Sequence, residues 1–211
     1  QAIVVVSVKN PDLDTYLLDK LLTVISYNRI VPLICFTKLD LLTDDKVNEI
    51  EEFMEYYKNQ GYFVTTNLDI ESFEDVFSNK ITVLTGQSGA GKSSLLNRIS
   101  PDLKLKTNEI SYALNRGKHT TRHTELYSVM NGYVVDTPGF SSVDFHGMDK
   151  YAIRDNMNEM FHYLENCKYR DCMHVKEDGC YVKKMVADGL ILQSRYENYV
   201  HFIKDKEGER E

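Results

Sequence analysis

The chain has 211 residues, of which 42% are hydrophobic and 27% are charged, with four cysteines, no tryptophan and a formal net charge of −7. This length suits one large domain or a domain with a smaller appendage, and no apolar run approaches the ~18 residues that a membrane-spanning helix needs. The negative charge excludes general attraction to nucleic acid, so any such contact must use local basic patches.

The first part of the chain alternates short apolar runs with amphipathic stretches, which predicts strands and helices in turn. The expected elements are a strand at 3–8, a helix opened by Asn10-Pro11-Asp12, a strand at 32–36, a helix capped by Thr43-Asp44-Asp45 and closed by Gly61, a strand at 62–65 and at most two helical turns at 73–77. The sequence starts inside a core strand and without a methionine, so we expect that an N-terminal segment is missing or was removed.

The middle of the chain contains a strand–loop–helix signal and a hairpin. The apolar run 81–84 predicts a strand that leads through a glycine-rich loop into a helix. The polar stretch 101–124 is too long and patternless for a simple connection. The turn signal Asn131-Gly132 predicts a hairpin between strands at 126–130 and 133–135.

The character of the sequence changes after residue 149. We expect a helix over 151–164, then a Cys/His cluster, then helical stretches near 183–188 and 193–204. The charged tail at 205–211 is expected to be disordered.

The glycine-rich loop 86–93, GQSGAGKS, fits the pattern G-x-x-x-x-G-K-[ST]. Such a loop turns backbone N–H groups toward phosphates, and the following helix N-terminus adds partial positive charge. Lys92 would reach the β- and γ-phosphates, and the Ser93 hydroxyl would bind magnesium. The loop therefore predicts a nucleotide-binding site.

Two further motifs follow apolar strands. Asp136-Thr137-Pro138-Gly139 would place Asp136 near the magnesium ion, and the Gly139 N–H would contact the γ-phosphate. In Thr37-Lys38-Leu39-Asp40, the Asp40 carboxylate matches the paired N1 and N2 donors of guanine, whereas adenine offers no such pair. The three motifs together favour a guanine nucleotide.

The base motif at 37–40 precedes the phosphate loop, whereas ordinary GTPases of this type carry it last, so the chain is expected to be circularly permuted. The sequence resembles the ribosome small subunit-dependent GTPase A family, circularly permuted GTPases that assist assembly of the small ribosomal subunit. The resemblance covers nearly all of residues 1–204.

The resemblance and the strand–helix alternation imply an α/β fold of P-loop NTPase type, a mostly parallel sheet with helices on both faces, plus a small helical zinc-binding domain. We expect a permuted GTPase domain at 1–147 and the zinc-binding domain at 148–204, without the N-terminal OB-fold domain that the family normally carries.

The resemblance also implies a switch at Gly117-Lys118-His119-Thr120-Thr121, in which we favour Thr121 over Thr120 as a magnesium ligand. Thr65-Thr66-Asn67 matches the family's second base motif poorly and is set aside. Thr37 stands where asparagine is usual, which is expected to loosen the bracing of the phosphate loop. The candidate nucleotide-binding residues are Thr37, Lys38, Asp40, Gly86, Gln87, Ser88, Gly89, Ala90, Gly91, Lys92, Ser93, Ser94, Thr121, Asp136 and Gly139.

Hydrolysis needs a group that orients the attacking water. Phe140 stands where many GTPases place a glutamine, and its side chain makes no hydrogen bond. In the family resembled, the switch histidine is the candidate, which is His119 here. Two alternatives for His119 are that it is a solvent-exposed loop residue or that it contacts an RNA phosphate.

Cys167, Cys172, His174 and Cys180 supply three thiolates and an imidazole within fourteen residues, which fits a closed, structural zinc site. His162 is an alternative ligand to His174. Basic and aromatic residues interleave around this cluster, which suits RNA contact, although acidic residues among them also fit a solvated face.

The sequence thus predicts a monomeric, cytoplasmic GTPase that binds GTP with Mg²⁺, carries one structural Zn²⁺, and acts on the small ribosomal subunit and its rRNA without contacting a membrane. The alternative is a guanine-nucleotide-dependent sensor or scaffold with negligible turnover.

Overall fold

The computed structural model describes residues 1–103, 125–136 and 143–208, with the side chains of Glu125 and Asp136 left out. Within these ranges the chain forms two compact units. The first comprises residues 1–14, 31–58 and 62–142, and the second comprises 15–30, 59–61 and 143–211. The C-terminal unit therefore takes in a helix from near the N-terminus, in addition to the region that we expected at 148–204.

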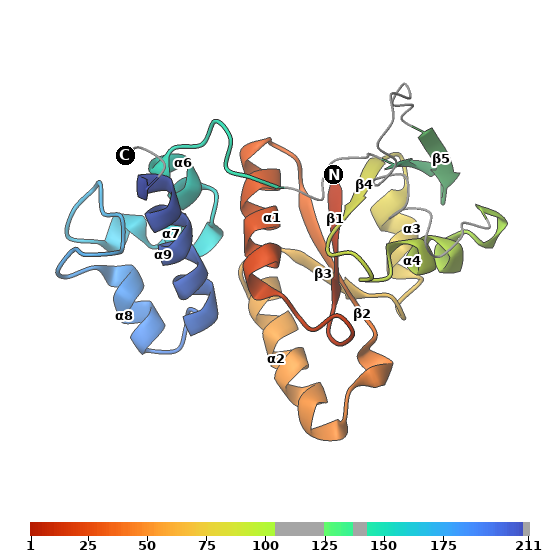
Figure 1. Cartoon of the computed structure of the whole chain (residues 1–211), viewed down its shortest axis with the longest axis horizontal. Helices are drawn as coiled ribbons and strands as arrows, with labels where there is room; N and C mark the ends of the chain where they lie inside the picture. Colours follow the sequence, from red (N-terminus) through yellow and green to blue (C-terminus); the bar gives the residue numbers. More distant parts are fainter. Residues whose placement is uncertain (104–124, 137–142, 209–211) are drawn as a thin grey trace. The chain divides into compact units, whose positions relative to one another are not determined.

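The first unit is built on one sheet of six strands in the order β3-β2-β1-β4-β6-β5 (Figure 1). The strands are β1 (Ala2–Ser7), β2 (Pro32–Thr37), β3 (Phe63–Thr66), β4 (Ile81–Thr85), β5 (Glu125–Val129) and β6 (Gly132–Asp136). All neighbours pair in parallel except the β5–β6 hairpin. This confirms the expected mostly parallel sheet.

Helices cover both faces of this sheet. Apolar residues of α3 (Ser72–Phe77) and α4 (Lys92–Ile99) form one core with Ile3, Val5 and Val134. On the opposite face, Phe53 of α2 (Asp44–Asn59) packs edge-on against Phe36, with ring centroids 6.1 Å apart. Short 3-10 turns follow β2 at Leu39–Leu41 and α4 at Pro101–Leu103.

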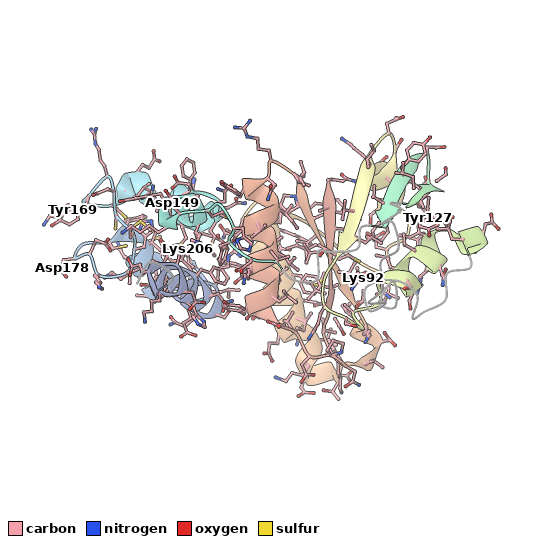
Figure 2. All side chains as sticks on the ribbon, turned by 45° about the horizontal axis from the view of Figure 1, so that its top comes forward. Lys92, Tyr127, Asp149, Tyr169, Asp178 and Lys206 are labelled. Carbon is pink, nitrogen blue, oxygen red and sulfur yellow. The ribbon has the colours of Figure 1, made fainter. Side chains whose placement is uncertain are left out.

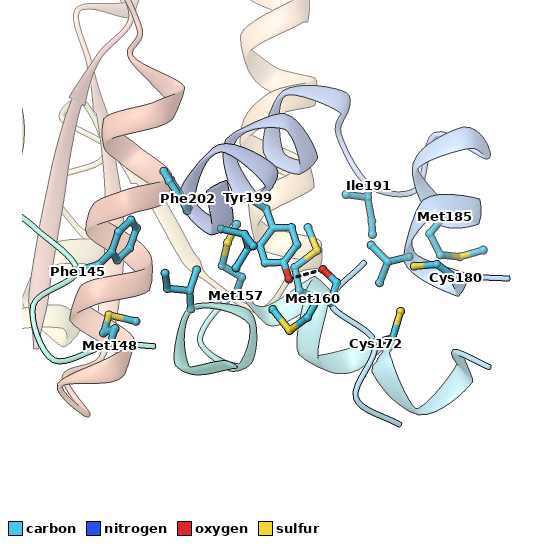
Figure 3. Close-up of a cluster of buried hydrophobic side chains, with 14 residues drawn as sticks. Phe145, Met148, Met157, Met160, Cys172, Cys180, Met185, Ile191, Tyr199 and Phe202 are labelled. Atoms are coloured by element: carbon cyan, nitrogen blue, oxygen red, sulfur yellow. Dashed lines mark hydrogen bonds between the residues drawn. The ribbon is translucent and has the colours of Figure 1, made fainter. Parts of the chain in front are cut away.

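The second unit joins α1 (Thr15–Tyr27) to the C-terminal helices. These are α6 (Lys150–Asp155), α7 (Asn158–His162), the 3-10 turn Leu164–Asn166, α8 (Tyr181–Ala187) and α9 (Gln193–Gly208). Met157, Met160, Tyr199 and Phe202 are central in its core (Figure 3). None of the helices in the described ranges is long and apolar enough to span a membrane.

A buried ion network joins three helices of the second unit. Arg195 of α9 donates to Asp19 of α1 at 2.5 Å and to Glu159 of α7 at 3.1 Å, and all three side chains are fully buried. Asn198 adds a 2.7 Å hydrogen bond to Asp19. No sequence pattern predicted this network, which ties α1 to helices far away in the sequence.

Two expectations about this unit were wrong. The single helix expected over 151–164 is divided, because the Asn156 side chain donates to Ala152 O at 2.8 Å and Met157 is extended. Residues 205–208 are helical rather than disordered. Side-chain contacts hold this last turn, including a 3.3 Å hydrogen bond from the Tyr16 hydroxyl to Asp205.

Candidate nucleotide site and metal centre

The motifs predicted to bind nucleotide lie at one edge of the sheet. The base motif follows β2, the phosphate loop follows β4, and Asp136 is the last residue of β6. Because β2, β1, β4 and β6 run parallel, the carboxyl ends of these strands share an edge, which is where α/β folds of this kind bind ligands.

Gly86 begins the phosphate loop at a point where the backbone leaves no room for a side chain. Its φ is +128°, and a Cβ atom there would lie 2.1 Å from the carbonyl oxygen of Val5. At the other end of the loop, Gly91 has a φ of +96° and caps α4. The two glycines thus shape the turn between β4 and α4.

Lys92 lies at the start of α4 (Figure 2). Its ammonium group donates to the carbonyl oxygens of Gly86 and Gln87, each at 2.8 Å, and burial lowers the pKa of the side chain. Phosphate oxygens of a nucleotide would compete for the same donors. The next residue, Ser93, is buried within the first turn of the helix.

Thr37 braces the phosphate loop directly. Its hydroxyl lies 2.6 Å from Ala90 O and 3.3 Å from Val6 O, and since it has one proton, it donates to the nearer carbonyl. Both Thr37 and Ala90 are buried. Thr37 therefore braces the loop with its own hydrogen bond, and a looser brace than the usual asparagine provides stays a prediction.

Replacing Thr37 with valine is expected to weaken GDP binding about tenfold, because the buried Ala90 carbonyl would lose its donor, at a cost of about 1–3 kcal/mol. Titration calorimetry measures the affinity. Thr37→Ser keeps the hydroxyl and should retain wild-type affinity. Thr82→Val removes another buried threonine hydroxyl of the sheet and should leave GDP binding unchanged. Equal affinities for Thr37→Val and wild type would refute the brace.

The base motif also contacts the loop that follows β1. The Lys38 ammonium group donates to Asn10 O, and Lys9 donates to Leu41 O at 3.1 Å. Asp40 lies exposed within the 3-10 turn. The sequence did not predict the contact at Asn10. This contact uses the backbone carbonyl, which every residue has, so no residue type signals it.

Asn67 lies at the same edge, directly after β3. Its N–H donates to Phe36 O at 2.9 Å, so it sits beside the end of β2. Its side-chain oxygen Oδ1 is buried and has no hydrogen-bond partner in the described part of the chain. The segment that was set aside as a poor base motif is thus adjacent to the strand that carries the base motif.

Some candidate residues lie outside the described residues. These are His119, Thr120, Thr121, Gly139 and Phe140, and of Asp136 only the backbone is described. Their placement at the site remains a prediction.

The structure brings Cys167, Cys172, His174 and Cys180 together, with one ligand atom from each within 4.8 Å of the others. The Sγ atoms of Cys167 and Cys180 are 4.0 Å apart, and His174 Nδ1 is 3.3 Å from Cys180 Sγ. A tetrahedral zinc with Zn–S bonds of about 2.3 Å would place two sulfurs roughly 3.8 Å apart. The donor set and its spacing therefore suit a four-coordinate metal ion.

The surroundings of His174 prepare its Nδ1 atom for a metal. Nε2 lies 3.1 Å from Met160 O and can only donate to it, so the proton sits on Nε2 and Nδ1 keeps its lone pair. Burial lowers the pKa of His174 to about 4, so the ring is neutral. The Tyr196 hydroxyl donates to His174 O at 2.7 Å. The Tyr199 hydroxyl donates to Met173 O, also at 2.7 Å (Figure 3).

The alternative ligand His162 is exposed, and its ring packs against Tyr163 instead. It is absent from the metal-ligand group that the described residues form. Near the cluster, Lys168 lies 5.2 Å from the ring centre of Tyr169, and Lys184 lies 5.8 Å from that of Tyr181. The interleaved basic and aromatic residues thus form cation–π pairs on this unit.

A phosphate loop, an upstream base motif and a mostly parallel sheet define a circularly permuted P-loop GTPase. The sequence profile of the RsgA GTPase family matches residues 1–146. The chain belongs to this RsgA GTPase family and is a GTPase, so the resemblance expected from the motifs is confirmed.

Two curated relatives are both named small ribosomal subunit biogenesis GTPase RsgA. The one from Enterococcus faecalis is 44% identical over 211 residues, which span 99% of this chain and 71% of the relative. The one from Bacillus subtilis is 46% identical over 215 residues, spanning 98% and 72%.

Two solved structures are similar over 99% of this chain. The circularly permuted GTPase YloQ has a TM-score of 0.82 and 36% identity, with 68% of its chain covered. YjeQ from Thermotoga maritima also has a TM-score of 0.82, with 34% identity and 71% of its chain covered. These similarities confirm the permuted fold.

Proposed function

We propose that this GTPase acts in the biogenesis of the small ribosomal subunit, binding the subunit with GTP and leaving it after hydrolysis. The names of the relatives support this role, since identity to them is above 40% over nearly the whole chain. The proposal that GTP controls this role rests on one observation, the phosphate loop that Thr37 braces at the carboxyl edge of the sheet.

The candidate site residues have distinct parts in this proposal. Lys92 and the loop N–H groups bind the phosphates, and Asp40 selects guanine through its paired acceptors. Ser93 and Thr121 would hold Mg²⁺ directly, and Asp136 would hold it through water; the ion would neutralise charge that develops on the phosphates during hydrolysis.

His119 is proposed to orient the attacking water, because Phe140 cannot do so. With purified small ribosomal subunits present, His119→Ala is expected to lower the stimulated rate of phosphate release by about 100-fold at unchanged GTP affinity. His123→Ala, a change in the same segment, is the matched control and should keep the stimulated rate. An unchanged rate for His119→Ala would remove the histidine from the mechanism.

The same assay tests the function itself. Stimulation of GTP hydrolysis by small subunits, absent with large subunits, supports the assembly role. A rate that small subunits leave unchanged favours the second candidate, a guanine-nucleotide sensor with negligible turnover, which the apolar Phe140 makes plausible.

We also propose that the Cys/His group holds one structural Zn²⁺, since four protein ligands leave no position for a reacting water. Metal analysis is expected to find about one equivalent of zinc, and Cys172→Ala to lose it with a large loss of stability. Cys35→Ala is the control, because burial raises the pKa of that thiol to about 12 and it lies in the sheet. Full zinc in Cys172→Ala would exclude this ligand set.

The basic and aromatic residues on the second unit are proposed to contact rRNA. Phosphate groups suit their ammonium groups, and unpaired bases can stack on Tyr169 and Tyr181. The protein is proposed to act as a monomer in the cytoplasm, where the small ribosomal subunit would be assembled.

A further inference from the structure

One carboxylate lies beside the metal centre without belonging to the Cys/His group. Glu177 follows His174 by three residues. Its Oε1 atom accepts a hydrogen bond from the Met173 N–H at 2.9 Å. Its Oε2 atom accepts from the N–H groups of Val175 and Lys176, each at 3.0 Å. A single side chain thus binds three of the four backbone N–H groups of the 173–176 loop, which carries the histidine ligand.

The 173–176 loop holds His174 in a backbone conformation that needs support. The φ angle of His174 is +58°, in the left-handed region that residues with a side chain rarely adopt. Contacts elsewhere must therefore stabilise this conformation. Glu177 binds the N–H groups of Met173 and Val175, which lie on either side of His174. The carboxylate thus restrains the backbone before and after the ligand.

The backbone conformation of His174 decides where its imidazole ring points. Nε2 lies 3.1 Å from Met160 O, and Nδ1 lies 3.3 Å from Cys180 Sγ. The carbonyl group of His174 is held as well, because it accepts a 2.7 Å hydrogen bond from the Tyr196 hydroxyl. A change in the backbone torsions of the loop would therefore move Nδ1 away from the thiols with which it shares the metal.

We propose that Glu177 is a positioning residue for the metal centre, whose carboxylate holds the 173–176 loop in the shape that presents His174 Nδ1 to the ion. This role rests on the proposal above that the Cys/His group holds Zn²⁺. Hydrogen bonds to an ionised acceptor are stronger than neutral ones, so three of them to one carboxylate oppose movement of the loop. Both oxygens of Glu177 are directed at N–H groups, so it acts through His174 and not as a fifth ligand.

The test measures the zinc affinity of the 211-residue chain by competition with a chromogenic chelator. Glu177→Gln has nearly the same shape, but its single acceptor oxygen leaves at least one of the three N–H groups facing an NH₂ group. Glu177→Leu removes both acceptors. Partners of this kind outside the ligand set change metal affinity by about 10–100-fold. We therefore expect the zinc dissociation constant to rise about 10-fold in Glu177→Gln and about 100-fold in Glu177→Leu.

Two control variants separate positioning from net charge and from general stability. Asp178→Asn removes the carboxylate of the next residue, which is exposed, and should leave the zinc affinity within about twofold of wild type (Figure 2). Ile203→Val opens a small cavity in the core of the same unit. It should lower the melting temperature by about 2–4 °C without changing the zinc affinity. Circular dichroism of the zinc-loaded proteins identifies any variant that does not fold, and Glu177→Gln decides alone if Glu177→Leu is one of them.

A zinc affinity of Glu177→Gln equal to that of wild type would overturn the role of Glu177. An equal loss of affinity in Asp178→Asn would also overturn it, because net charge would then be the cause. So would an equal loss in Ile203→Val, because reduced stability would then suffice. A wild-type chain that binds no zinc would instead refute the proposed zinc site, and the role of Glu177 with it.

Discussion

Replacing Arg195 with methionine is expected to lower the free energy of unfolding by about 3–5 kcal/mol, because it leaves two buried carboxylates without their guanidinium group. Arg195 contacts Asp19 at 2.5 Å and Glu159 at 3.1 Å, with all three side chains fully buried. Methionine has nearly the volume of the arginine stem, so lost packing contributes little. For a chain of this size, the melting temperature should fall on the order of 10 °C.

Urea unfolding followed by circular dichroism measures the effect, with Lys184→Met as a control for the loss of an exposed cation. A triple variant that also replaces Asp19 and Glu159 with leucine removes the buried charges, and should regain most of the lost stability. If the triple variant is no more stable than Arg195→Met, unpaired charge is not the cause.

Gly86→Ala is expected to abolish detectable guanine-nucleotide binding. A Cβ atom at this position would lie 2.1 Å from Val5 O, which is backbone and cannot move aside as a side chain could. The loop must therefore shift away from β1, and the N–H groups that would surround the phosphates lose their positions. We expect the GDP affinity to fall at least 1,000-fold, on the order of 4 kcal/mol.

Gly89→Ala is the matched control within the same loop. Its φ is +78°, and the nearest atom to an added Cβ is a Pro11 ring carbon at 3.6 Å. Only the left-handed backbone opposes alanine here, at a cost of roughly 1–2 kcal/mol, so binding should fall about tenfold. Titration with fluorescent GDP measures the affinity of both variants and so distinguishes their effects. Equal losses would show that crowding against Val5 does not decide the effect.

Much of the nucleotide site was predictable because its residues are contiguous in sequence. Two short segments contain most of the predicted binding groups, and each follows an apolar strand. These are the phosphate loop from Gly86 to Ser93 and the base motif from Thr37 to Asp40. The Cys/His group was predictable for the same reason, since its ligands span fourteen residues. The mostly parallel sheet could be inferred from the alternation of strands and helices together with the family resemblance.

The parts that sequence reasoning missed depend on contacts between distant residues. The hydroxyl of Thr37 donates to Ala90 O more than fifty positions away, so no local pattern predicts this hydrogen bond. The ends of helices were missed where one side chain decides them, as Asn156 does in α6. The helical turn at 205–208 depends on Tyr16 and Phe145, which are remote from it.

The assignment of α1 to the second unit has a practical consequence for dissecting the protein. Neither compact unit is a continuous stretch of chain, because residues 15–30 and 59–61 interrupt the first unit and belong to the second. A truncation after residue 147 would retain Asp19 but remove Arg195, Glu159 and Asn198, which are its partners. A fragment that begins at 148 would lack the helix carrying Asp19. The two units are therefore interleaved along the chain, and dividing the chain at any single position does not separate them from each other.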